Sequence, residues 1–284
     1  MQTAGFSTIL CPVDFSELSA QALRHAAALA KCGDARIVAA YANWFEAPPY
    51  FTEGRLAELE SQFRESMGEA EHSLKDFVKS TLGDGAAAVD TRVVDGLPAD
   101  AILDLTESTH ADLVVMGTHG RTGFNHWMLG SVTERILRES PVPLLTVRGA
   151  PTEPIRRILC PIDGTDISGH AFRLAAGLGA CFGAVVTALY VSEGGSDQPP
   201  PDICDWIPAE ERQRCRVREL VRHGDPAEEI IALASAEECD LIVLGAPRRR
   251  FFEGMVLGTT TLRAVRHAPC PVLTVSGPRK VAHE

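Results

Sequence analysis

The chain repeats itself, and this repeat constrains its fold more than any other feature of the sequence. The residues at 9–14, ILCPVD, return as ILCPID at 158–163, which is an offset of 149 positions. Further along, DLVVMG at 112–117 returns as DLIVLG at 240–245, where the offset has fallen to 128. The chain therefore holds two copies of one folding unit, and the second copy is 21 residues shorter in its middle.

The boundary between the copies lies at the segment 149–154, GAPTEP, whose glycine and prolines are typical of a break in regular structure. We expect one domain over residues 1–150 and a second over residues 151–284. A long amphipathic helix is predicted over Gly54–Leu82. The second copy has GGSDQPPP at 194–201 in this region, which cannot form a regular helix.

Short apolar runs alternate with helical patterns in each copy. The first copy has five such runs, predicted as strands, at Ile9–Val13, Ile37–Ala42, Thr91–Val94, Leu113–Gly117 and Leu144–Val147. Runs that are apolar on both faces are typical of parallel strands covered by helices on both sides. Ser16 is a suitable N-cap for a helix after the first strand, and Pro98 can open another. The alternation predicts an α/β fold with two tandem doubly wound sheets.

Composition and charge exclude several classes of protein. The net charge is −11, divided as −8 over residues 1–150 and −3 over the remainder, so neither copy has the basic surplus that nucleic acid requires. No run of about 18 uncharged apolar residues is present, so no membrane span is expected. The N-terminus lacks the pattern of a secretory signal, which favours the cytoplasm.

The eight cysteines form no CxxC pair. Because cytoplasmic thiols are kept reduced, we expect them to be small core residues. Cys32 and Cys181 occupy equivalent positions in the two copies, again at an offset of 149. A zinc site formed by Cys204, Cys215 and a nearby histidine is an alternative, although its spacing matches no established pattern.

The loop after the fourth predicted strand of the first copy has the properties of a phosphate-binding site. It contains Gly117, Gly120 and Gly130, and Ser131 follows directly. Glycines let backbone N–H groups approach an anion closely. A helix is predicted over 131–139, and the free N–H groups and dipole of its N-terminus attract negative charge. The sequence contains no GxxxxGK[ST], which excludes a P-loop NTPase. No GxGxxG follows the first strand, which disfavours a dinucleotide site.

Several polar side chains accompany this loop. The hydroxyls of Ser131 and Thr133 can donate to phosphate oxygens. His119 and Arg121 can contact phosphate, or can equally be solvated cations of the loop. Asp14 ends the first strand; it either faces the loop or caps the helix that follows, and the neighbouring glycines and hydroxyl favour the first interpretation.

The pattern Gly-x2-Gly-x9-Gly-Ser after a fourth strand, with Pro-Val-Asp after the first, strongly resembles the universal stress protein (UspA-like) family. The resemblance is to the ATP-binding subgroup in its tandem two-domain form, and it covers nearly the whole chain, once per copy. It implies two Rossmann-like (HUP-type) domains, each with a five-stranded parallel sheet of order 3-2-1-4-5 flanked by helices. Ligands bind where such an order reverses, beyond the carboxyl ends of the strands.

The resemblance also implies roles for individual residues. Asp14 would contact the adenine and ribose, and the backbone at Ala42 would line the adenine pocket. The ribose and phosphates of ATP, ADP or AMP would be held by residues of the loop and of the helix start, namely Gly117, Gly120, Gly130, Ser131, Val132 and Thr133. Mg²⁺ would accompany a triphosphate, although no carboxylate cluster for it is visible and no metal ligand is assigned.

The second copy retains only part of the site. Four equivalents of site residues remain, at Asp163, Gly245, Gly258 and Thr259. The middle glycine has become Arg248, and Pro247 removes an N–H group. We therefore predict weak or no ATP binding in this copy. The alternative is that the arginines at 248–250 bind an anion by charge.

The expected function is that of an ATP-binding protein of stress response or signalling. The alternative is a slow ATPase or nucleotidyl-transferring enzyme on the same fold, which would need a base or an arginine clamp. The fifth strands, Leu144–Val147 and Val272–Val275, are expected to pair with each other within the chain, because such apolar edges are normally covered. Two chains can also associate as a homodimer, and the protein partner is unknown.

Overall fold

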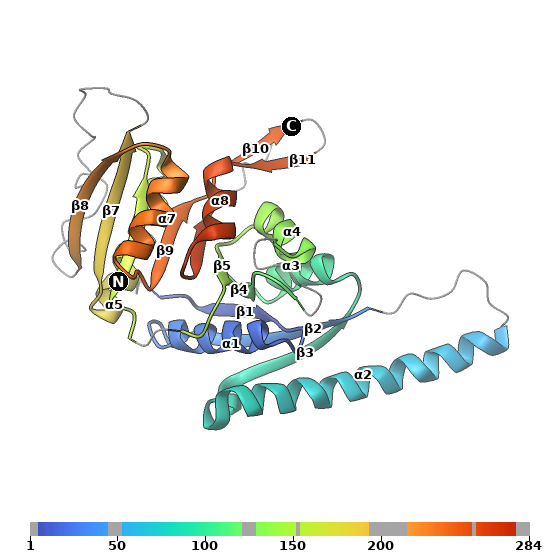
Figure 1. Ribbon diagram of the computed structural model, residues 1–284. Coiled ribbons are helices and arrows are strands. Elements are labelled where there is room, and N and C mark those ends of the chain that lie inside the picture. Colours follow the sequence, from blue (N-terminus) through green and yellow to red (C-terminus); the bar gives the residue numbers. More distant parts are fainter. Residues whose placement is uncertain are drawn as a thin grey trace.

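Ten strands form one continuous sheet in the computed structural model of the protein (Figure 1). The structure describes residues 5–44, 53–120, 129–151, 154–192, 215–251 and 254–276. The sheet order is β3-β2-β1-β4-β5-β12-β9-β6-β7-β8, so each half contributes five neighbouring strands. Both halves have the order 3-2-1-4-5 that the family resemblance implies.

In the first half, all neighbouring strands are parallel. They are β1 (Thr8–Pro12), β2 (Arg36–Asn43), β3 (Val89–Asp95), β4 (Leu113–Gly117) and β5 (Leu144–Val147). The predicted bounds of the fourth and fifth strands are confirmed, and the other three differ by one or two residues at their ends. The prediction succeeds for β1, β4 and β5 because these three strands are buried and their apolar runs are nearly continuous.

The second half repeats this arrangement with β6 (Arg157–Ile162), β7 (Val185–Ser192), β8 (Arg216–His223), β9 (Leu241–Gly245) and β12 (Val272–Val275). It also contains a hairpin that sequence analysis does not predict. The strands β10 (Arg248–Phe251) and β11 (Gly254–Leu257) pair antiparallel to each other, apart from the main sheet. The segment that we compared with the Gly120 loop is therefore partly a β-strand.

Helices cover both faces of the sheet, and each face has its own apolar core. One core includes residues of α1 (Glu17–Ala30), α2 (Glu53–Leu82) and α5 (Asp166–Phe182). The other includes residues of α3 (Pro98–Ser108), α4 (Ser131–Glu139), α7 (Pro226–Ala236) and α8 (Thr259–His267). A short 3-10 helix, η1 (Gly83–Ala88), connects α2 to β3. None of the described helices combines the length and apolar composition that a membrane crossing requires.

The two halves meet along their fifth strands. β5 and β12 pair antiparallel, and Leu145 lies opposite Leu273, its equivalent at the offset of 128. Since a residue can face its own equivalent only on a twofold axis, a pseudo-twofold axis passes through this pair. Arg148 crosses the axis and donates hydrogen bonds to the carbonyl oxygens of Val265, at 2.9 Å, and Arg266 at the end of α8.

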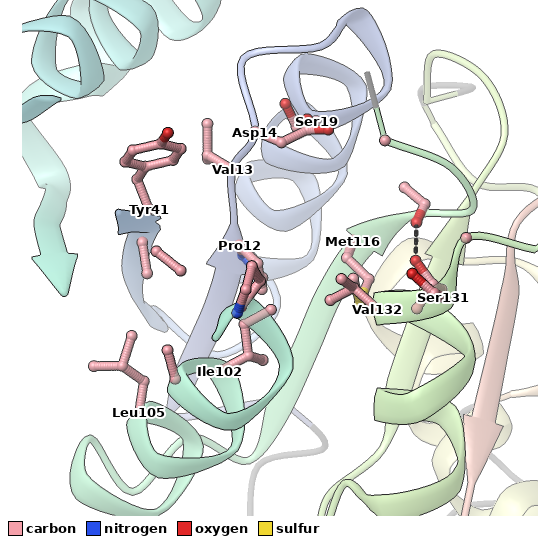
Figure 2. Close-up of a pocket in the computed structure, with 18 of the residues that line it drawn as sticks. Pro12, Val13, Asp14, Ser19, Tyr41, Ile102, Leu105, Met116, Ser131 and Val132 are labelled. Carbon is pink, nitrogen blue, oxygen red and sulfur yellow. Dashed lines mark hydrogen bonds between the residues drawn. The ribbon is translucent and has the colours of Figure 1, made fainter. Parts of the chain in front are cut away.

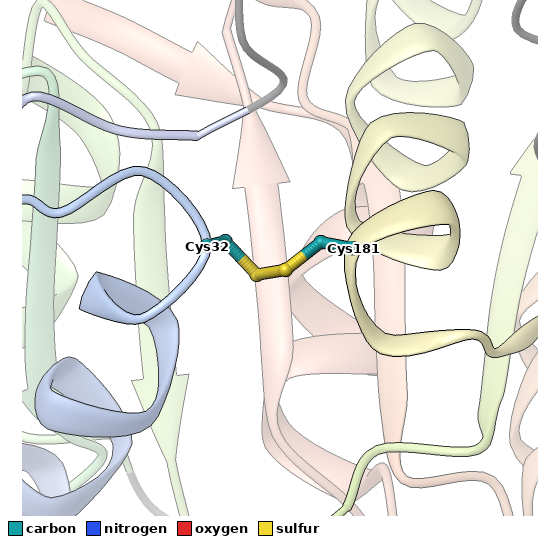
Figure 3. Close-up of a disulfide and its surroundings, with 2 residues drawn as sticks. All are labelled: Cys32 and Cys181. Atoms are coloured by element: carbon teal, nitrogen blue, oxygen red, sulfur yellow. A yellow bond between two sulfur atoms is a disulfide. The ribbon is translucent and has the colours of Figure 1, made fainter.

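The expectation that all the cysteines are unpaired core residues is wrong for one pair. Cys32 and Cys181 form a disulfide, and their Cα atoms lie 5.7 Å apart (Figure 3). The equivalence of the two positions was visible in the sequence, but only the fold brings them together. The other described cysteines are buried and free, as expected, at positions Cys11, Cys160, Cys215, Cys239 and Cys270.

The zinc alternative is only partly tested by the structure. No group of three side chains able to hold a metal occurs among the described residues. Cys204 lies outside them.

Candidate functional site

Most of the predicted site residues of the first half gather around a cavity of about 320 Å³ (Figure 2). The cavity lies at the carboxyl ends of β1, β2 and β4, where the strand order reverses. Its walls include the predicted residues Asp14, Ala42, Gly117, His119, Gly120, Gly130, Ser131, Val132 and Thr133. Arg121 lies outside the described residues.

Asp14 has a structural role as well as a place in the cavity wall. Its Oδ1 accepts hydrogen bonds from the backbone N–H of Ser16 at 3.1 Å and from the Ser16 hydroxyl at 2.6 Å. Ser16 in turn is the N-cap of α1 and accepts from the N–H of Ser19 at 3.2 Å. The two interpretations offered for Asp14 are therefore compatible, because the carboxylate orders the start of α1 while it faces the cavity.

The three loop glycines differ in what surrounds them, and packing requires only two of them. A Cβ atom on Gly117 would lie 2.9 Å from the Cβ of Leu18, so this glycine lets β4 pack closely against α1. A Cβ on Gly120 would lie 2.7 Å from Oδ2 of Asp14. A Cβ on Gly130 would meet no atom closer than 3.5 Å. Since none of the three has a positive φ, close approach and not backbone conformation explains the first two.

The N-terminus of α4 opens directly into the cavity. Its N-cap is Gly130, which has no side chain to accept a hydrogen bond from the first turn. The N–H groups of residues 131–133 precede the first intrahelical hydrogen bond, in which Glu134 donates to the carbonyl of Gly130 at 2.8 Å. An uncapped helix start of this kind attracts anions.

The hydroxyls near this helix start have different surroundings. Thr133 is buried, and its hydroxyl donates to the carbonyl of Gly117 at 2.9 Å, which joins α4 to the end of β4. Ser131 is exposed at the cavity wall and is the hydroxyl better placed to meet a ligand. The half-buried ring of His119 places Nδ1 2.9 Å from the hydroxyl of Thr118.

The opposite wall of the cavity is apolar. Ala42, at the end of β2, lies beside Val94 of β3, and α3 contributes Ile102 and Leu105 to the wall. Figure 2 shows Ile102 and Leu105 across the cavity from Ser131 and Val132. Sequence analysis placed Ile102 and Leu105 on one face of a helix but did not assign them to the site. The cavity thus has an apolar side and a side rich in N–H groups.

Tyr41 is a cavity residue that sequence analysis missed, although an aromatic residue at the end of a predicted strand was a usable signal. Its ring lies 4.7 Å from that of Phe15, which lies 5.6 Å from the ring of Phe77 in α2. Phe15 has a φ of 64°, a conformation that a bulky residue rarely adopts. Gly164 stands at the equivalent position of the second half, with a φ of 79°.

The second half has a corresponding cavity of about 540 Å³, lined by Asp163, Gly245, Gly258 and Thr259 among others. Asp163 accepts hydrogen bonds from Thr165, as Asp14 does from Ser16. Burial raises the pKa of Asp163, but the hydrogen bonds from Thr165 and Ser168 lower it further, so it lies below the ordinary 3.8. Gly258 is the N-cap residue of α8 and has no side chain to accept a hydrogen bond from the first turn. The difference lies at Arg248, which begins β10 and pairs with Leu257.

Comparisons with known proteins agree across both halves. The sequence model of the Universal stress protein family matches residues 5–148 and again residues 154–276. A universal stress protein of Methanocaldococcus jannaschii is 33% identical over 146 residues, covering 50% of this chain and 82% of that protein. A universal stress protein of Mycolicibacterium smegmatis is 27% identical over 299 residues, covering 97% and 99% respectively.

A solved structure shows the same fold over nearly the whole chain. The crystal structure of a universal stress protein from Archaeoglobus fulgidus covers 97% of this chain and 99% of its own, with a TM-score of 0.70 and 21% identity. A universal stress protein in complex with cAMP matches 51% of this chain and 98% of its own, with a TM-score of 0.37 and 24% identity.

Proposed function

The chain belongs to the universal stress protein family, and from this premise we propose that its first domain, residues 1–150, binds ATP. The bound nucleotide would serve a stress response or signalling. The observation that carries the proposal is the uncapped start of α4, which opens into a cavity with an apolar opposite wall. This combination suits a ligand with an aromatic base at one end and phosphates at the other.

The residues divide between the two ends of such a ligand. The base would lie between the end of β2 at Ala42 and the apolar face of α3. The phosphates would lie against Gly120, Gly130 and Ser131, where N–H groups and a hydroxyl are available. Asp14 would lie between the two ends and accept hydrogen bonds from the ribose hydroxyls. ADP and AMP would use the same contacts with fewer phosphates.

A magnesium ion would be held mainly by the phosphates and water. Asp14 is the only carboxylate among the described residues that line the cavity, and Mg²⁺ bound with nucleotides usually keeps several waters.

We place the protein in the cytoplasm. One further partner would be a protein that binds differently to the nucleotide-bound and nucleotide-free forms. A second copy of the chain would be the partner in a homodimer. Pairing of the fifth strands would hold the two domains together in solution.

An enzyme on this fold is the second candidate. Hydrolysis would need a group to position water, and the cavity offers Asp14 and His119. Both already make hydrogen bonds to neighbouring residues, with Ser16 and Thr118 respectively. We therefore expect ATP turnover well below about 1 s⁻¹, the lower end of ordinary enzyme rates. A higher rate would favour the enzyme.

Gly130→Ala is a clean test of the site. The added Cβ meets only ordinary contacts within the protein, so the fold should tolerate it, whereas it would project toward the phosphates. We expect at least a ~10-fold loss of ATP affinity by isothermal titration, or about 1.4 kcal/mol. Gly258→Ala is the matched control, because its Cβ is also unhindered and it lies in the second half.

The composition of the bound nucleotide is measured separately, by mass spectrometry of what the purified protein releases. We expect ATP or ADP at near one per chain. Unchanged affinity in Gly130→Ala would overturn the site, and two nucleotides per chain would mean that the second domain, residues 151–284, has a working site of its own.

A further inference from the structure

The disulfide between Cys32 and Cys181 lies on the pseudo-twofold axis of the molecule. Cys32 follows the end of α1, and Cys181 lies in the last turn of α5. The two residues are equivalents in the repeat, and equivalents meet only on the axis. Figure 3 shows the bond between the segment that follows α1 and the last turn of α5. It therefore joins the two halves independently of the β5–β12 pairing.

Among the described cysteines, Cys32 and Cys181 are the two that are not buried. Burial raises the pKa of Cys11 and of Cys270 to about 12, and that of Cys239 to about 11. These thiols stay protonated and shielded from reagents, so they are poor nucleophiles. Cys181 is exposed and Cys32 is half-buried, so small thiols can reach their bond.

We propose that Cys32 and Cys181 form a reversible thiol–disulfide site that locks the two halves together when oxidised. Its co-reactant is a low-molecular-weight disulfide and the corresponding thiol. One cysteine thiolate attacks the small disulfide, which forms a mixed disulfide and releases one small thiolate. The second cysteine then attacks the mixed disulfide and releases the other. The two cysteines lose two electrons and two protons, and the small disulfide is reduced to two thiols.

The position of the bond gives it a structural consequence. α1 begins beside Asp14 at the first cavity, and α5 begins beside Asp163 at the second. Both helices end at the disulfide. Oxidation thus fixes the helices that carry the two cavities relative to each other, while reduction leaves the halves held by β5–β12 and the shared cores. In a reducing compartment such a bond is typically transient and sensitive to redox state.

The test uses the full chain, equilibrated in buffers with different ratios of reduced to oxidised glutathione. Free thiols are trapped with a maleimide under native conditions and located by peptide mass spectrometry. We expect Cys32 and Cys181 to gain two tags in the most reducing buffer and none in the most oxidising one. Cys239→Ser is the matched control and should leave this transition unchanged. In Cys32→Ser, Cys181 should instead hold one glutathione.

Hydrogen exchange of the same samples measures how strongly the disulfide restrains the ends of the two helices. The ends of α1 and α5 should exchange about tenfold faster in the reduced protein, while β5 and β12 stay protected. Two free thiols in the most oxidising buffer would overturn the proposal. So would a disulfide that survives the most reducing buffer, which would be a permanent crosslink. Equal exchange in the two redox states would refute the lock itself.

Discussion

Phe15 is a bulky residue in a conformation that normally requires glycine, and this leads to an unusual prediction. Its φ of 64° places it in the left-handed region, directly between Asp14 and the N-cap Ser16. Its ring contacts Tyr41 in the cavity wall and Phe77 in α2. We infer that this packing holds the backbone in place, since Gly164 occupies the equivalent position without any such ring.

The expected changes in stability follow from two contributions, the packing of the Phe15 ring and the strain of its left-handed backbone. Truncation of a fully buried Phe to Ala costs about 3–5 kcal/mol, and Phe15 is half-buried, so Phe15→Ala should lose about 2 kcal/mol of stability. Alanine keeps the left-handed strain of about 1–2 kcal/mol, which glycine lacks. Glycine loses about 0.4–1 kcal/mol through its freedom in the unfolded chain. Phe15→Gly should therefore be about 0.5–1 kcal/mol more stable than Phe15→Ala, the reverse of the usual order.

Urea denaturation of the three proteins measures this difference. Gly183→Ala is the matched control, because Gly183 has a φ of 67° and no atom within 4 Å of an added Cβ. It should lose about the same 0.5–1 kcal/mol of stability, because the left-handed strain of alanine exceeds its gain from a less flexible unfolded chain. If Phe15→Ala were as stable as Phe15→Gly while Gly183→Ala was destabilised, the strain would not reside at Phe15 and the reasoning would fail.

Three further predictions concern the site and the contact between the halves. Gly120→Ala should displace Asp14, whose Oδ2 would lie 2.7 Å from the new Cβ, and weaken ATP binding about 10-fold or more by titration calorimetry. Arg148→Ala should lower the free energy of unfolding by about 1.5–3 kcal/mol in urea, because charged hydrogen bonds to carbonyls at the end of α8 are lost; a change under 0.5 kcal/mol would contradict this. The pKa of Asp163 is lower in the folded protein than its ordinary 3.8, so its stabilising contribution is present above about pH 4 and lost as the pH falls through the folded value. In Asp163→Asn, the free energy of unfolding should therefore fall less steeply as the pH is lowered below about 4. An unchanged dependence on pH would contradict this role of Asp163.

The fold could be predicted from the sequence because local signals and the repeat agreed. Ser16 accepts a hydrogen bond from the N–H of Ser19 as a helix N-cap should, and α4 spans the predicted residues 131–139. The hairpin of β10 and β11 could not be predicted in this way. Its first strand, RRRF, lacks both a continuous apolar run and regular alternation, which are the signals that identify strands.

The site was harder to predict, because a sequence motif gives the residue types but not the contacts that require them. Gly117 and Gly120 look alike in sequence, yet one makes room for Leu18 and the other for Asp14. The disulfide was missed for a related reason. Nothing local to Cys32 or Cys181 indicates a bond, and only the meeting of equivalent residues on the axis brings their Cα atoms to 5.7 Å.

A comparison of the two halves shows which residues of the motif are evidence for nucleotide binding and which are needed for the fold itself. Thr133 donates to the carbonyl of Gly117, and Thr261 donates to that of Gly245 at 3.4 Å. The carboxylate after the first strand also orders the following helix in both halves. These interactions stabilise the domain whether or not a ligand binds, so their presence in the second half is no evidence for a second nucleotide. The largest change in the loop lies at Gly120, where the second half has Arg248 and a β-strand. Any loss of binding in the second half should therefore trace to that exchange.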